Sequence, residues 1–232
     1  MDSVQMHTVR SFDQELDQLS TLAVRMGRMS VSRLDQAVQV VGQGNIEEVR
    51  NLIAADAEID ALEQEIHSQA VRIIALRQPM ADDLRAIVCA LKISSDFERI
   101  GDYAANICKR GLVLEWQPSV PVLETVSEMA RLVQELMSEA LHAYQHRDEE
   151  RAKIVRQRDR EIDGLFSTIL EQLISFMGER SQSVTACTHL IFIAKGLERA
   201  GDHIVTAAET IHFLITGRVM SRTSPYPHAE GG

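Results

Sequence analysis

Most of the chain repeats apolar residues at helical spacing, and a few polar breaks interrupt the pattern. Leu52, Ile59 and Ile66 recur every seven residues, which is typical of the buried face of a helix in a bundle. Proline costs ~3 kcal/mol inside a helix, and it is absent from residues 1–78 and 122–224. The pattern predicts six helices, over about residues 5–41, 46–75, 80–112, 122–146, 149–177 and 184–217.

Capping residues and prolines mark the boundaries. Asn45 stands three residues before Glu48, the spacing of a capping box, and Asp148 is placed to cap the fifth predicted helix. Residues 116–121 read Trp-Gln-Pro-Ser-Val-Pro, which is typical of a linker. We therefore expect a first three-helix bundle over residues 1–116, a second over 122–220 and a flexible tail over 221–232.

Two short segments occur twice in the chain. Residues 56–62, DAEIDAL, return 103 residues later as DREIDGL, and residues 98–102, ERIGD, return 100 residues later as ERAGD. Two matches at nearly one offset indicate an internal duplication. Only 4% of the residues are aromatic, and helix-forming residues dominate. The sequence therefore predicts an all-α fold of six helices, arranged as two repeated antiparallel three-helix bundles.

Charge and composition exclude several classes of protein. Twenty-four Lys and Arg against thirty-four Asp and Glu give a net charge of −10, whereas a nucleic-acid surface needs a basic face, so we expect no nucleic-acid partner. The sequence shows neither a long uncharged apolar run nor a basic and apolar leader, which predicts a cytoplasmic protein. Cys89, Cys108 and Cys187 have no CxxC spacing, so we expect buried thiols and no disulfide.

A glutamate interrupts the apolar stripe at the same place in both repeats. Glu98 follows Leu84 and Leu91 at heptad spacing, and Glu198 follows Val184 in the same way. A carboxylate turned toward a core must be paired, hydrogen-bonded or bound to a cation, because burial of an unpaired charge is costly. Each repeat therefore carries a candidate site.

Further oxygen donors follow each glutamate along its helix. Asp102 and Asn106 follow Glu98 at one and two turns, and Asp202 and Thr206 repeat this spacing in the second half. If the second helix of each half packs beside the third, more aspartates converge on these residues, namely Asp56 and Asp60 in the first half and Asp159 and Asp163 in the second. Converging carboxylates repel one another unless a cation joins them.

Several interpretations of these carboxylates are open. Hard oxygen ligands without Cys or paired His favour Mg, Mn, Ca or Fe. An ion-pair network through Arg99 and Arg199 is an alternative, and so is a metal-free helical adaptor. A ferritin-like di-iron carboxylate protein is another, because residues 139–142 and 209–212 both have the ExxH spacing. The sequence has no phosphate loop, nucleophile elbow or HExxH, so we expect no enzyme and no catalytic residues.

Three segments together resemble the PhoU family, phosphate uptake regulators that accompany the phosphate-specific ABC transporter. They are residues 95–107, SDFERIGDYAANI, residues 196–204, GLERAGDHI, and residues 77–85, RQPMADDLR. The resemblance covers about residues 8–218, and the repeated ExxxD motifs in helical context make it specific. It implies an all-helical, cytoplasmic homodimer that represses phosphate-starvation signalling through contacts with the transporter ATPase and a membrane sensor histidine kinase. Association with the membrane would be peripheral and only through these partners.

The resemblance also implies binding of divalent or trivalent metal ions such as Fe, Mn, Mg or Zn through the ExxxD motifs. Carried onto this chain, the implied metal ligands are Glu98, Asp102, Asn106, Glu198 and Asp202, with contributions from Asp56, Asp60, Asp159 and Asp163. Thr206 departs from the pattern, because the family would have Asn there. The second cluster is therefore expected to hold fewer or weaker ligands, or to use Glu209 one turn on.

Overall fold

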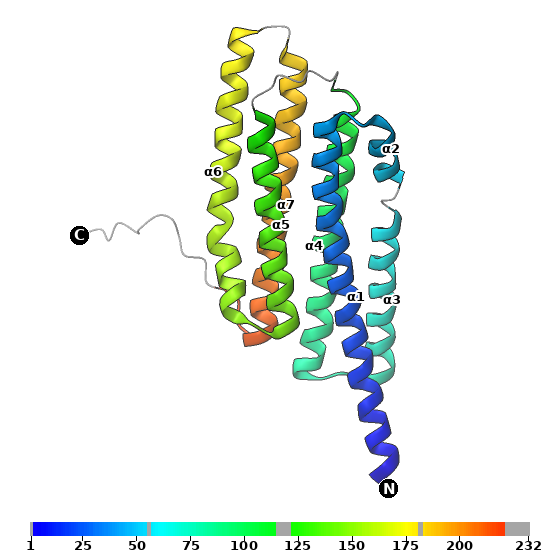
Figure 1. Cartoon of the computed structure of the whole chain (residues 1–232). Coiled ribbons are helices and arrows are strands. Elements are labelled where there is room, and N and C mark those ends of the chain that lie inside the picture. Colours follow the sequence, from blue (N-terminus) through cyan, green and yellow to red (C-terminus); the bar gives the residue numbers. More distant parts are fainter. Residues whose placement is uncertain (1, 55–56, 115–121, 181–182, 221–232) are drawn as a thin grey trace, which may run out of the picture.

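The computed structural model describes residues 2–54, 57–114, 122–180 and 183–220, with side chains from Phe12 onward. These residues form seven helices and no strand (Figure 1). The helices are α1 (Asp2–Gln43), α2 (Ile46–Ala54), α3 (Ala57–Arg77), α4 (Ala81–Gly111), α5 (Val122–His146), α6 (Glu149–Glu179) and α7 (Val184–Thr216). The all-helical class is confirmed. The linker expected over 116–121 and the tail expected over 221–232 lie outside the described residues.

One expected helix differs from the structure. The single helix predicted over about 46–75 is described as α2 followed by α3, with residues 55 and 56 outside the description. Glu58 and Asp60 lie in the first turn of α3, where the positive end of the helix dipole favours acidic residues. The repeated segment lies in the middle of α6, which is continuous, so the same sequence pattern is compatible with both arrangements.

The predicted helix caps are confirmed. The backbone N–H of Glu48 donates to Asn45 Oδ1 at 3.3 Å, and Asn45 Nδ2 donates to Glu48 Oε2 at 2.9 Å. The backbone N–H of Arg151 donates to Asp148 Oδ1 at 3.1 Å. Both caps satisfy N–H groups that the first turn of a helix leaves without an intrahelical acceptor.

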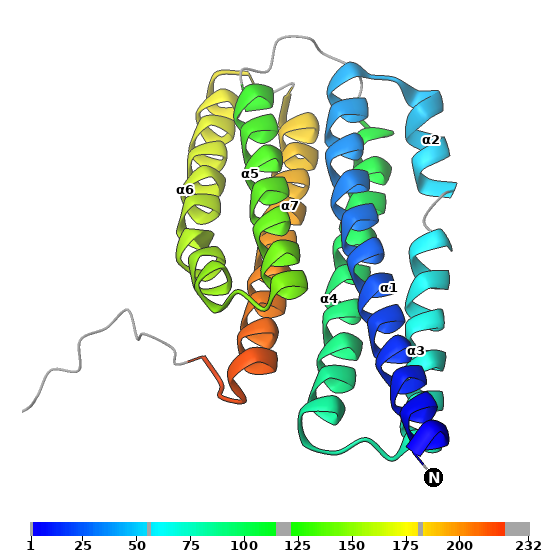
Figure 2. The same ribbon diagram turned by 60° about the horizontal axis from the view of Figure 1, so that its bottom comes forward.

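The helices form two groups that lie side by side, α1 to α4 in one and α5 to α7 in the other (Figure 2). The groups meet where α1 packs on α5 and where α4 packs on α7. Fully buried apolar side chains fill the interior of both groups, among them Phe97, Ile100, Leu197 and Ile204. All three cysteines are buried thiols outside any disulfide, as predicted. No helix in the described part of the chain is long and apolar enough to span a membrane.

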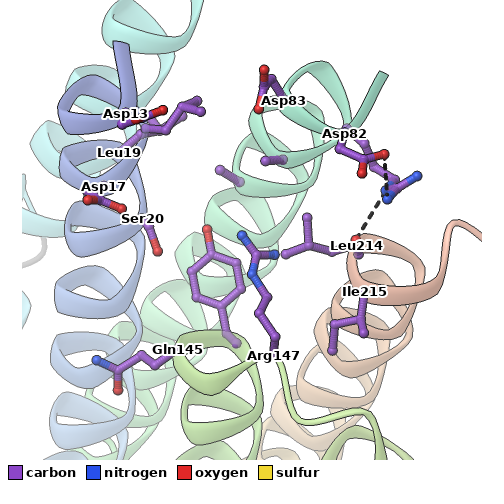
Figure 3. A pocket seen from close by; sticks show the side chains of 15 residues that line it. Asp13, Asp17, Leu19, Ser20, Asp82, Asp83, Gln145, Arg147, Leu214 and Ile215 are labelled. Atoms are coloured by element: carbon purple, nitrogen blue, oxygen red, sulfur yellow. Dashed lines mark hydrogen bonds and ion pairs between the residues drawn. The ribbon is translucent and has the colours of Figure 1, made fainter. Parts of the chain in front are cut away.

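Two arginines on either side of the turn between α3 and α4 hold this end of the structure together, Arg77 within the first group and Arg85 across to the second. Arg77 forms a two-point ion pair with Glu15 of α1, with N–O distances of 3.0 and 2.9 Å. Arg85 Nε donates to the carbonyl oxygen of Leu214 on α7 at 3.1 Å, and its guanidinium pairs with Asp82 at 3.0 Å. A cavity of about 570 Å³ lies beside this contact, between α1, α4 and the ends of α5 and α7 (Figure 3).

Gly27 marks a place where α1 packs closely against both α4 and α5. A Cβ built there would lie 2.7 Å from a ring carbon of Phe97 on α4 and 2.8 Å from Leu141 Cδ2 on α5. Phe97 is fully buried and Leu141 is nearly so, so neither side chain has room to withdraw. Glycine at this position lets one helix contact both groups.

We expect Gly27→Ala to destabilise the protein by about 2 kcal/mol, because the cost of overpacking exceeds the gain in helix propensity. Gly164→Ala is the matched control, since Gly164 lies within α6 and a Cβ added there would meet nothing within 4 Å. The control should gain up to ~1 kcal/mol. Urea denaturation followed by circular dichroism measures both, and a Gly27→Ala variant as stable as wild type would contradict the packing described here.

Candidate metal centre

The two ExxxD motifs lie at equivalent close contacts between helices. A Cβ built on Gly101 of α4 would lie 2.8 Å from Ile59 Cδ1 of α3, and one built on Gly201 of α7 would lie 2.6 Å from Ile162 Cδ1 of α6. Ile59 and Ile162 are 103 residues apart, the offset of the duplicated segment. The duplication therefore preserves a glycine contact that places the acidic residues of two helices against each other, as the sequence predicts.

In the first half, Glu98 is held at the contact and is only 19% exposed. Arg99 Nε lies 3.5 Å from Glu98 Oε2, and Arg99 Nη1 lies 3.1 Å from Asp102 Oδ2. Even so, the pKa of Glu98 is raised to about 7. Burial is the largest cause, and the negative charges of Asp102 and Glu63 add to it. Arg99 is itself more than half exposed, so solvent weakens its attraction. The first cluster therefore carries negative charge that its arginine does not balance.

In the second half, Glu198 is 15% exposed. Lys195 Nζ lies 2.6 Å from Glu198 Oε1, but the other carboxylate oxygen, Oε2, is buried and has no hydrogen-bond partner among the described residues. Burial, then the charges of Asp163, Asp202 and Glu198, raise the pKa of Asp159 to about 6. Burial and the charge of Glu198 also raise the pKa of Asp202. Asp163 and Asp202 are themselves exposed, so the four carboxylates of α6 and α7 act on one another from the edge of the helix contact.

The predicted ligands do not all take part equally. Asp60 and Asn106 are exposed, and neither contributes to the pKa shift of Glu98. Asp56 lies outside the described residues. The Thr206 hydroxyl donates to the backbone carbonyl of Asp202 at 3.0 Å. Glu63 belongs to the first cluster and was not among the predicted ligands, although its position seven residues after Asp56 was a usable signal.

The arrangement fits a cation in charge and donor type. Both clusters offer oxygen donors, and Glu198 Oε2 is a buried acceptor without a donor among the described residues. Within the part of the chain that is described, no three side chains of His, Cys, Asp or Glu are already gathered around one point as a metal site. The clusters therefore supply charge and hard oxygen donors, and a full coordination shell requires the side chains to rotate toward a common centre.

The alternatives to a metal site are only partly supported. Arg99 pairs with both acids of the first motif, whereas in the second motif the partner of Glu198 is Lys195 and not Arg199. The arginine-centred ion-pair network is thus present in the first half, whereas a lysine pairs with the glutamate of the second half.

The ferritin-like interpretation is disfavoured by the contacts of its glutamates. Glu139 pairs with Arg151 at 2.7 Å and Glu209 with Arg156 at 3.4 Å. His212 lies against Glu149 and the carbonyl oxygen of Arg218, so its ring nitrogens are already engaged.

The pH dependence of stability tests the buried charge at Glu98. An acid whose pKa is raised in the folded state loses stability as pH rises from its unfolded pKa, near 4.5, to its folded pKa, near 7. In chelator-treated protein we expect Glu98→Gln to be about 1 kcal/mol more stable than wild type at pH 8, after allowance for screening, and equally stable at pH 4. Urea denaturation at both pH values measures this.

Glu171→Gln, on an exposed face of α6, is the matched control and should change little at either pH. A Glu98→Gln variant that is less stable than wild type at pH 8 would show that the pair with Arg99 outweighs the cost of burial.

Known proteins of one family are similar to this chain over nearly its whole length. Residues 23–111 and 126–211 each match the PhoU domain. The chain is 39% identical to the phosphate-specific transport system accessory protein PhoU homolog of Xylella fastidiosa strain Temecula1, over 92% of this chain and 89% of that protein. It is 40% identical to the homolog of Caulobacter vibrioides strain NA1000, over 94% of this chain and 96% of that protein.

Solved structures agree with the sequence matches. The crystal structure of PhoU from Pseudomonas aeruginosa superposes with a TM-score of 0.84 at 30% identity, covering 89% of this chain and all of that one. The phosphate transport system regulatory protein PhoU from Streptococcus pneumoniae gives a TM-score of 0.83 at 26% identity, over 90% of this chain and 99% of that one. The two matched domains coincide with the two groups of helices and with their repeated motifs, and the chain is a member of the PhoU family of phosphate transport accessory proteins.

Proposed function

We propose that this protein is a metal-binding cytoplasmic regulator of phosphate uptake, which represses phosphate-starvation signalling by contact with other proteins. Its partners would be the ATPase of the phosphate ABC transporter and a membrane sensor histidine kinase, and it would act as a homodimer. Membership of the PhoU family supports the role in phosphate uptake. The observation that carries the metal-dependent part is the duplicated carboxylate cluster, in which a buried oxygen of Glu198 has no partner among the described residues.

In the second half, Glu198, Asp202, Asp159 and Asp163 would hold the ion, and in the first half Glu98 and Asp102 would do so with Glu63. Oxygen donors favour Mg, Mn or Fe, and the family resemblance adds Zn. A bound cation supplies local positive charge, which turns an acidic surface into one that attracts phosphate or the carboxylates of a partner.

The other residues of each cluster orient the carboxylates. Lys195 holds one oxygen of Glu198 and leaves Oε2 as an acceptor. Arg99 bridges Glu98 and Asp102 across one turn of α4. The glycines at 101 and 201 keep the paired helices close enough for acids on both to act on the same ion.

Removal of two carboxylates from the second cluster tests this assignment. We expect the double variant Asp159→Asn and Glu198→Gln to bind Mn²⁺ at least ~10-fold more weakly than wild type, since loss of even an outer-shell partner costs this much. Elemental analysis of purified protein and calorimetric titration of chelator-treated protein provide the measurement. A double variant with Glu128→Gln and Glu171→Gln, both on exposed helix faces, is matched in charge and should retain affinity.

Unchanged metal content in the cluster variant would remove the site assignment. A pull-down of the transporter ATPase with and without chelator separates the two remaining functions. Binding that requires the metal supports the metal-dependent regulator, and binding that ignores it supports a metal-free helical adaptor.

A further inference from the structure

A polar groove runs along the outer face of α1, between α3 and α5. Arg25, Arg28 and Ser32 lie one turn apart on this face, and with Arg33 they line a groove of about 690 Å³. Glu58 at the start of α3 and Gln145 near the end of α5 form its walls.

A second hollow of about 340 Å³ adjoins the first. It shares Arg28, Ser32 and Gln145 with the first hollow and adds His142 of α5. Because they have three lining residues in common, the two hollows form one continuous groove, which we call the α1 groove.

The α1 groove is positively charged in an acidic protein. Three guanidinium groups face one carboxylate, that of Glu58, which gives the first hollow a charge of +2 (three minus one) while the chain carries −10. Arg25 is exposed and has no acidic partner among the described residues. Arg28 Nη2 donates to the neutral acceptor Gln145 Oε1 at 3.3 Å. Among the described residues, two of the three arginines are thus left without a counter-charge.

Two residues that line the α1 groove also carry a nitrogen without a hydrogen-bond partner among the described residues. Arg33 is 13% exposed, and its Nη2 lies 2.6 Å from Glu58 Oε2, but its Nη1 is buried with no hydrogen-bond partner among the described residues. Nδ1 of His142, a residue that lines the second hollow, is also buried and has no hydrogen-bond partner among the described residues. Buried polar groups in folded proteins nearly always have partners. Because a guanidinium N–H can only donate, Arg33 Nη1 indicates an acceptor supplied from outside, and a protonated His142 would offer a second donor.

We infer that the α1 groove binds a phosphate group, either as inorganic phosphate or on a small phosphate ester. Guanidinium groups bind phosphate oxygens through two parallel N–H bonds, and three arginines line this groove. The hydroxyl of Ser32 adds one further donor, whereas that of Thr21 already donates to the carbonyl oxygen of Asp17 at 2.8 Å. Val24 and Met29 line the same hollow, which leaves room and an apolar wall for an organic substituent. None of these residues belongs to the carboxylate clusters, so the inference is independent of the metal centre.

The test is calorimetric titration of chelator-treated protein with inorganic phosphate, AMP and adenosine. We expect phosphate or AMP to bind and adenosine not to bind, because the groove recognises the phosphate group. The double variant Arg25→Gln and Arg28→Gln should bind about tenfold more weakly or worse. Arg50→Gln and Arg72→Gln, both exposed and outside the groove, form the charge-matched control and should bind as wild type does. Tighter binding of phosphate identifies the free anion as the ligand, and tighter binding of AMP identifies an ester.

A second measurement locates the binding site in wild-type protein, so it does not depend on whether the variants fold. Phosphate should slow the modification of Arg25 and Arg28 by phenylglyoxal in wild-type protein, as followed by mass spectrometry, and should leave Arg72 unaffected. The inference is overturned if neither phosphate nor AMP binds, if both double variants lose affinity equally, or if only an acidic peptide such as oligoglutamate binds. Because the protein is free of metal throughout, each of these outcomes leaves the metal-binding proposal to its own test.

Discussion

Negative charge held at two close helix contacts is the constraint on which the rest of this structure depends. Glycine at 101 and 201 brings α4 against α3 and α7 against α6. The acids on either side are then partly removed from water and act on one another, which raises the pKa of Glu98 to about 7 and that of Asp159 to about 6. Such an arrangement is costly for the protein alone and favours any cation that reduces the repulsion.

The two halves meet this constraint in different ways. In the first half an exposed arginine, Arg99, bridges two acids and Glu63 adds a third. In the second half Phe166 stands at the position equivalent to Glu63, and Lys195 lies over its ring while pairing with Glu198. The second cluster draws its acids from α6 instead, through Asp159 and Asp163. The duplication has thus kept the helix contact while the donors around it diverged.

Local signals in the sequence predicted much of the fold. Asn45 and Asp148 act as caps because their side-chain oxygens match the free N–H groups of the next turn, a short-range effect that spacing reveals. The repeated segments ERIGD and ERAGD carry a glycine at the same place, and this duplication was a usable signal for the two close helix contacts. The description of residues 46–77 as two helices, α2 and α3, could not be predicted. The acidic segment at residues 56–62 is repeated at residues 159–165, and there it lies within the continuous helix α6.

The placement of the candidate carboxylates was predicted in outline and not in detail, and their role as metal ligands stays a prediction. Heptad spacing placed Glu98 and Glu198 at the edge of the core, where they are indeed mostly buried. Heptad spacing could not predict that Asp60 and Asn106 are exposed to solvent, because their exposure depends on how each helix is rotated against its neighbour. The α1 groove escaped sequence analysis for a related reason. A polar stripe on a helix normally indicates solvent, and the contributions of Glu58 and Gln145 come from helices distant in sequence.

The most direct test of the central claim is the titration of the side-chain carboxyl groups by carbon-detected NMR in metal-free protein. The account predicts that Glu98 titrates near pH 7 and Asp159 near pH 6. It also predicts that saturating Mg²⁺ keeps both groups ionised over that range. Titration of both carboxyls near their ordinary values of ~4, with no response to the cation, would contradict it.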